Sequence, residues 1–94
     1  MNKYEIMFIV KPDVEDDARN ALIENFKKVL TNTEGTVDNV NEWGLRDLAY
    51  EIKDYTKGYY VVVDTTTTPA NIAEFERLSR INANVLRHLT LRRD

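Results

Sequence analysis

The order in which strand-like and helix-like stretches follow one another constrains this chain more than any single motif does. Side chains that alternate every second residue predict a strand, and apolar side chains every three or four residues predict a helix. These stretches run in the order strand, helix, strand, strand, helix, strand at residues 4–10, 13–34, 36–53, 59–67, 68–82 and 85–91. Right-handed crossovers return both helices to one face of the sheet. The order therefore predicts an α+β, ferredoxin-like βαββαβ fold, with a four-stranded antiparallel sheet and two helices on one face.

Capping residues mark the predicted helix ends. Asp13 follows Pro12 and is expected to be the first N-cap, with Asp16 three residues later as in a capping box. Thr68 and Pro69 predict the second helix start, since Pro is tolerated in the first turn. Gly35 is expected in the left-handed position just past the first helix. The expected core-facing stripes are Ala18, Leu22, Phe26, Val29 and Leu30, then Ile72, Phe75, Leu78 and Ile81.

The middle strands carry irregular features. Val37 and Val40 would fall on opposite faces of a regular strand, which predicts a bulge or twist between them. Leu48, Tyr50 and Ile52 alternate regularly with their neighbours and predict a regular strand. Residues 54–58 are expected to form a hairpin turn or a longer loop before the strongly strand-prone residues 59–67.

The second face of the predicted sheet is not covered by helices. Strand alternation places Met7 and Ile9 on this open face, together with Tyr60 and Val62 if that parity of the third strand faces outward. An exposed apolar face often marks a partner-binding surface, although small sheet proteins also expose some apolar atoms without a partner. We therefore expect Met7, Ile9, Tyr60 and Val62 to bind a partner.

Length and charge restrict the function classes. Ninety-four residues suffice for one domain, expected to span residues 1–94. Thirteen Lys and Arg against sixteen Asp and Glu give a net charge of −3, which by itself argues against a nucleic-acid partner. The positive charge is concentrated near the C-terminus, however, and could form a local basic patch. No segment is apolar for the length of a membrane helix and no secretory signal is present, so a cytoplasmic location is expected.

Catalytic and metal-binding patterns are weak. The chain has no Cys, and its one Ser (Ser79) and one His (His88) stand in no nucleophile motif. The acidic residues 13–17 fit a first helical turn and lack calcium-loop spacing, so neither a metal nor a cofactor is expected. Residues 57–63 match only the first positions of the RNA-stacking motif of RRM domains, which favours a buried strand instead.

Residues 44–53, Gly-Leu-Arg-Asp-Leu-Ala-Tyr-Glu-Ile-Lys, resemble the signature of the bacterial small-subunit ribosomal protein six family. Other parts that resemble the family are Lys3-Tyr4-Glu5, Lys11-Pro12, Gly58-Tyr59, Phe75-Glu76-Arg77-Leu78, Ile81-Asn82 and Leu86-Arg87-His88. The resemblance covers residues 3–92. It departs at Asn2 and Asp47, where basic residues are common, and at Glu51, where a number of members have Pro.

This resemblance implies a non-enzymatic component of the small (30S) ribosomal subunit that supports subunit assembly and translation. It implies binding to 16S ribosomal RNA together with small-subunit ribosomal protein eighteen, a basic partner that would offset the −3 charge. The cations expected to contact RNA phosphates are Lys3, Arg46, Lys53, Lys57, Arg80, Arg87, Arg92 and Arg93.

Two other hypotheses start from the same predicted fold. A small regulatory ferredoxin-like domain could use the open sheet face for self-association, and it would not need the basic C-terminal group. An acylphosphatase shares the fold but needs a phosphate-cradling loop with an Arg after the first strand. Lys11-Pro12-Asp13 offers no such loop.

Overall fold

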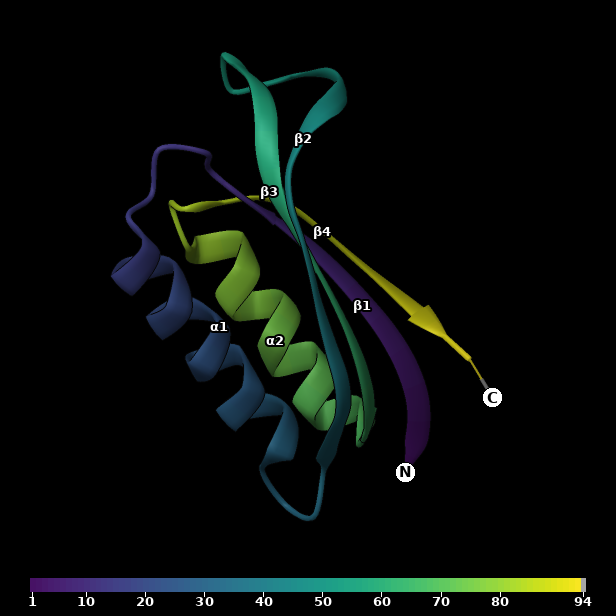
Figure 1. Ribbon diagram of the computed structural model, residues 1–94. Helices are drawn as coiled ribbons and strands as arrows, with labels where there is room; N and C mark the ends of the chain where they lie inside the picture. Colours follow the sequence, from purple (N-terminus) through teal and green to yellow (C-terminus); the bar gives the residue numbers. More distant parts are fainter. Residues whose placement is uncertain (94) are drawn as a thin grey trace.

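The computed structural model describes residues 1–93 and contains the six predicted elements in the predicted order (Figure 1). Their bounds are β1 Asn2–Val10, α1 Asp16–Thr31, β2 Thr36–Ile52, β3 Tyr55–Thr67, α2 Pro69–Ile81 and β4 Val85–Arg92. The strands form one antiparallel sheet in the order β2-β3-β1-β4, and both helices cover the same face. The ferredoxin-like prediction is confirmed.

The core lies between the helices and one face of β1. Ile6, Phe8 and Val10 point into it and are fully buried. Phe8 meets Phe26 from α1 and Phe75 from α2, with ring centroids 5.0 Å and 6.1 Å away, and the two helix rings are 5.0 Å apart. Edge-to-face aromatic contacts of this kind add to the stabilisation by apolar burial. The three rings therefore tie both helices to the central strand.

The predicted start of α2 is confirmed, whereas that of α1 is wrong. The Thr68 side chain accepts a hydrogen bond from the Asn71 backbone N–H at 3.1 Å, and Pro69 occupies the first turn. In contrast, α1 begins at Asp16 with Glu15 at the N-cap, and no side chain caps it. The Asp13 carboxylate accepts a hydrogen bond from the Tyr55 hydroxyl at 3.3 Å instead. The Asp13 side chain, which the local sequence pattern predicted to cap the helix, thus makes a long-range contact with Tyr55 instead.

The apolar stripes are partly confirmed. Ala18 and Ile81 are exposed, contrary to prediction, whereas Ile23 and Ser79 are buried. Ala18 lies in the first turn of α1 and Ile81 is the last residue of α2. Helical spacing gives the direction in which a side chain points, but it does not say how far the sheet beneath the helix extends.

The β2–β3 hairpin differs from its prediction at the turn. The predicted bulge is present as a register shift between Val37 and Asn39. The predicted hairpin turn is present, but it consists of Lys53 and Asp54, which both have positive φ, and residues 55–58 belong to β3 instead of the turn. This geometry matches the twist of the flanking strands, and Asp tolerates it.

The connection after α1 depends on close packing. The left-handed residues are Thr33 and Glu34, and not Gly35 as predicted. Gly35 is required for another reason, because a Cβ there would overlap the Leu30 carbonyl. The buried Asn71 amide donates hydrogen bonds to the backbone carbonyls of Leu30 and Asn32 and to the Thr67 hydroxyl. The Asn71 side chain thereby binds the Asn32 carbonyl, and it shares the Leu30 carbonyl with the Thr67 hydroxyl, which donates to it at 2.7 Å.

This arrangement predicts that Asn71→Ala lowers the free energy of unfolding by about 1 kcal/mol, because the Asn32 carbonyl loses its donor while the Leu30 carbonyl keeps the Thr67 hydroxyl. Urea unfolding followed by circular dichroism measures the change. Asn20→Ala is the matched control, since Asn20 is exposed on α1 and Ala favours a helix. Equal stability of the two variants would contradict the role given to Asn71.

Candidate functional site

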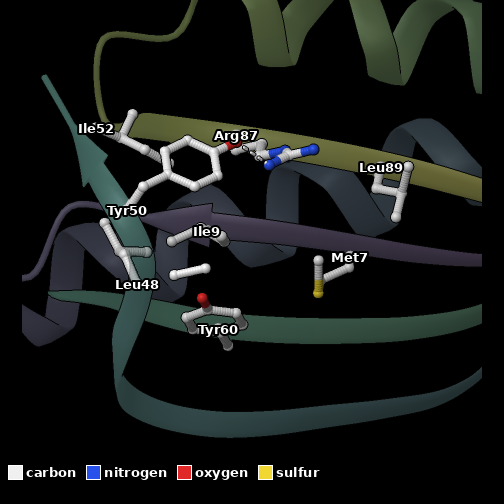
Figure 2. Close-up of a pocket in the computed structure, with 9 residues that line it drawn as sticks. Met7, Ile9, Leu48, Tyr50, Ile52, Tyr60, Arg87 and Leu89 are labelled. Carbon is white, nitrogen blue, oxygen red and sulfur yellow. Dashed lines mark hydrogen bonds between the residues drawn. The ribbon is translucent and has the colours of Figure 1, made fainter. Parts of the chain in front are cut away.

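The end of β2 crosses the open face of the sheet. Asp47 pairs with Lys57 and Ile52 with Tyr55, so the four residues 48–51 of β2 stand opposite a single residue of β3. We call residues 48–51 the crossing segment. The Tyr50 hydroxyl in it accepts a hydrogen bond from the Arg87 guanidinium on β4 (Figure 2). Because β2 and β4 are opposite edges of the sheet, this contact spans all four strands. Residues 48–52 belong to β2, as predicted, but the strand is not regular here because its register with β3 shifts between Asp47 and Ile52.

An apolar pocket lies beneath the crossing segment. Its volume is about 180 Å³. Figure 2 shows side chains from all four strands around it, including Met7, Ile9, Leu48, Tyr60 and Leu89. The Arg87–Tyr50 contact lies at one side, and the Tyr60 side chain adds a second hydroxyl. A pocket of this size with one cation beside it can accept a large apolar side chain of another molecule.

Gly58 allows the crossing segment to approach the sheet. A Cβ at this position would overlap the Ile9 side chain and would lie 3.4 Å from a methyl group of Leu48. Ile9 is 3% exposed although it faces away from the helices. The absence of a side chain at Gly58 therefore lets Ile9 and Leu48 pack over the sheet.

The side of the β2–β3 hairpin that faces away from the open face contacts helix α1. The Arg19 guanidinium of α1 lies over the Tyr59 ring, 3.9 Å from its centroid, and the Tyr59 hydroxyl donates to Glu42 at 2.8 Å. Burial, followed by the bond to Glu42, raises the pKa of Tyr59, while Arg19 opposes the shift. Tyr59 therefore faces the helices. It cannot stack an RNA base on the open face, where the RRM motif would require it.

The pKa values of Tyr55 and Glu74 are also shifted by their surroundings. Desolvation first, and then Asp13, raise the pKa of Tyr55, whose hydroxyl joins the hairpin to the β1–α1 connection. On α2, the Arg77 guanidinium donates to Glu74 and lowers the pKa of that carboxyl. All of these groups serve contacts within the fold, and none forms an acid–base pair in the pocket.

Aromatic residues continue the open face beyond the pocket. The Trp43 ring stacks on Tyr60, with centroids 6.1 Å apart and planes 9° apart, and the Arg46 guanidinium lies 5.4 Å from the Trp43 centroid. Residues that the sequence analysis left out of the site are Trp43, Leu48, Tyr50, Leu89 and Leu91. The sequence places these residues on strands, but it does not show the bulge that turns β2 across the open face.

The predicted partner-binding residues all lie on the open face. Met7 pairs with Val62 and Ile9 pairs with Tyr60 across β1 and β3. Ile9 and Val62 are buried within the chain, whereas Met7 and Tyr60 are half-buried and line the pocket. Ile9 and Val62 thus form the floor of the face rather than its accessible surface. That this face binds a partner stays a prediction.

The structure divides the predicted RNA-contact residues into two groups. We call the end of the sheet with the β2–β3 turn and the α2–β4 connection the turn end, and the opposite end the terminus end. The turn-end cations are Arg46, Lys53, Lys57, Arg80 and Arg87, and the terminus-end cations are Lys3, Arg92 and Arg93. The length of β1 separates the groups by about 25 Å. Arg87 faces the open side beside Ile9, and Arg92 pairs with Tyr4 on the helix side.

The two groups differ in how their charge is balanced. At the terminus end Arg93 donates to Glu5 at 2.9 Å, and Lys3 and Arg93 share a shallow pocket with Asp38 and Asp64. At the turn end Lys57 approaches Asp47 only to 4.0 Å, with both side chains largely exposed. Among residues 1–93, Arg46, Lys53, Arg80 and Arg87 form no ion pair with a carboxylate. The turn end therefore holds most of the predicted RNA-contact cations that have no carboxylate partner within residues 1–93, and Glu51 and Asp54 lie at the same end.

Features of other protein classes are not found in the part of the chain that the structure describes. Within residues 1–93, no three His, Cys, Asp or Glu side chains are placed to hold a metal ion. No helix in this part is long and apolar enough to cross a membrane.

These features define the class of the protein. It is a ferredoxin-like protein with an open apolar sheet face and several cations at the turn end. A family model described as ribosomal protein S6 matches residues 3–92. The crystal structure of 30S ribosomal protein S6 from Thermotoga maritima superposes with a TM-score of 0.90 at 35% identity, covering 98% of this chain and 87% of that one. The chain belongs to the ribosomal protein S6 family, as its sequence indicated, and is thus a protein of the small subunit of the cytoplasmic ribosome.

The packing at Gly58 generates a prediction. Gly58→Ala should lower the free energy of unfolding by about 1–3 kcal/mol, because the added methyl group meets Ile9. Ile9→Ala removes the Ile9 methyl group that the added Cβ would overlap. In that background Gly58→Ala should therefore cost less, and a double-mutant cycle by urea unfolding measures the coupling. An equal cost in both backgrounds would show that the Ile9 contact does not explain the glycine.

Proposed function

We propose that this protein is a structural, non-enzymatic component of the 30S subunit that binds 16S ribosomal RNA together with a small basic protein, small-subunit ribosomal protein eighteen. In this role residues 1–94 act as one domain that supports subunit assembly and translation. The observation that carries the proposal is the turn end, where four cations with no carboxylate partner among residues 1–93 lie beside an open apolar face.

The RNA contact follows from the charge distribution. Phosphate binding depends on Lys and Arg that displace counterions, and a cation already held by a carboxylate contributes less to that displacement. Arg46, Lys53, Arg80 and Arg87 meet this condition. Lys57 and the terminus-end group, Lys3, Arg92 and Arg93, would add further phosphate contacts. Contacts of this kind position the protein on RNA, so specificity would come from RNA shape and from the partner.

The protein contact follows from the open face. Exposed apolar side chains there include Tyr50, Leu89 and Leu91, which continue the surface of Met7 and Tyr60. A basic partner seated on this face would bring further cations beside the turn end. The complex would then carry the positive charge that a chain of net charge −3 lacks.

For the RNA contact, the triple variant Arg46→Gln, Lys53→Gln, Arg80→Gln should weaken binding to 16S ribosomal RNA in the presence of the partner. The slope of log K against log salt should fall by about 0.7–0.9 for each phosphate that the variant no longer neutralises. Filter binding over a range of salt concentrations measures both effects. The control triple Lys27→Gln, Lys28→Gln, Arg77→Gln removes the same charge from the helix layer. Equal slopes for the two triples would contradict RNA contact at the turn end.

For the protein contact, Leu89→Gln with Leu91→Gln should weaken binding of the purified partner by about tenfold or more, because both side chains are exposed on the open face. Isothermal titration calorimetry measures the affinity. The control is Leu45→Gln, since Leu45 is also exposed but lies opposite Tyr59 on the helix side. If Leu45→Gln weakened binding as much as the double variant, the open face would not be the docking surface.

A further inference from the structure

A second pocket lies at the turn end, between the end of α2 and the start of β4. Its volume is about 270 Å³. It is lined by Ser79 and Arg80 from α2, by residues 85–88 of β4 and by Lys53 from the β2–β3 turn. β4 is an edge strand, so this pocket follows the free edge of the sheet. It is distinct from the apolar pocket on the open face, although Arg87 lines both.

The charged side chains that line this pocket are all cationic. Lys53, Arg80 and Arg87 line it, and no Asp or Glu does. Among residues 1–93 neither Lys53 nor Arg80 has an ion-pair partner, and Arg87 donates to the neutral hydroxyl of Tyr50. The C-terminus of α2 contributes roughly half a negative charge, which three cations exceed. The pocket therefore favours an anion.

The buried hydroxyl of Ser79 also favours a bound anion. Ser79 is 2% exposed, and its Oγ has no hydrogen-bond partner within residues 1–93. The Nδ1 atom of His88, which also lines the pocket, has none either. Buried polar atoms are nearly always hydrogen-bonded, so an unpaired hydroxyl beside a cationic pocket indicates that a ligand or solvent atom completes it. Arg80, by contrast, is exposed and can swing towards a bound group.

We propose that this pocket is a binding site for one phosphate group, held by Lys53, Arg80 and Arg87 and hydrogen-bonded by Ser79. A phosphate suits the site better than a carboxylate, since its three or four oxygens can use several cationic donors and a hydroxyl at once. The inference rests on the proposed function in one respect, because the expected source of the phosphate is the backbone of ribosomal RNA. A free phosphate ion presents the same chemistry.

Nuclear magnetic resonance titration of the full chain with two probes tests the site. Inorganic phosphate represents the free ion and dimethyl phosphate represents an RNA phosphodiester, with ionic strength held constant by NaCl. We expect saturable shifts of the amides of residues 79–88 and of Lys53, and only small linear shifts at Lys3 and Arg93. Binding of both probes identifies a phosphodiester site, and binding of inorganic phosphate alone identifies a free-ion site. Absence of saturation at residues 79–88 with either probe overturns the proposal.

Variants separate this site from general charge. Arg80→Gln and Ser79→Ala should each weaken probe binding by about fivefold to tenfold, as expected when one bond to a charged group is removed. Arg77→Gln is the matched control, because Arg77 lies one turn earlier on α2 and is paired with Glu74. An equal weakening in Arg77→Gln overturns the proposal. If Ser79→Ala proves unstable, the effect of Arg80→Gln on probe binding still tests the proposal, because Arg80 is exposed.

The salt dependence of 16S ribosomal RNA binding, measured on the same preparations, keeps the two proposals apart. Absence of phosphate binding, with the turn-end triple variant still weakening RNA binding, would remove only this inference. An unchanged RNA affinity in the triple variant, with saturable phosphate binding, would remove the RNA role and leave an anion site.

Discussion

The contact between Tyr50 and Arg87 joins the two edge strands of the sheet, and the arrangement of the site depends on it. β2 and β4 lie at opposite edges, and the contact forms only because four residues of β2 loop out of register with β3. Gly58 leaves room for this path by placing no side chain against Ile9. The crossing segment thereby turns a flat sheet face into an apolar pocket. It also places the Arg87 guanidinium between that pocket and the basic turn end.

This geometry relates two surfaces that serve different kinds of contact. The helix layer pairs several of its charges internally, as in Arg77 with Glu74. The turn end keeps cations without carboxylate partners, and the open face beside it keeps exposed apolar side chains. A chain with net charge −3 can therefore present a local basic surface. In the proposed assembly, RNA and the basic partner would meet this protein at adjacent places.

The order of elements and the α2 cap could be predicted because they depend on local periodicity and capping. Residues 44–53 also identified the family, and the structure shows that they include the crossing segment. The start of α1 was missed because Asp13 bonds to Tyr55, 42 residues away. The path of residues 48–51 was missed because their alternation fits a regular strand, and only packing against Ile9 and Arg87 reveals the loop-out. Clustering of Lys53 with Arg80 likewise requires the tertiary fold.

The most direct test of this account is a nuclear Overhauser measurement on the free protein between the Tyr50 ring and the Arg87 side chain. The account predicts clear cross-peaks between them. It also predicts that Arg87→Ala shifts the signals of the Tyr50 ring while the core signals of Phe8 and Phe75 persist. Absence of these cross-peaks in the unmodified protein would contradict it. The open face would then lack its pocket until a partner bound.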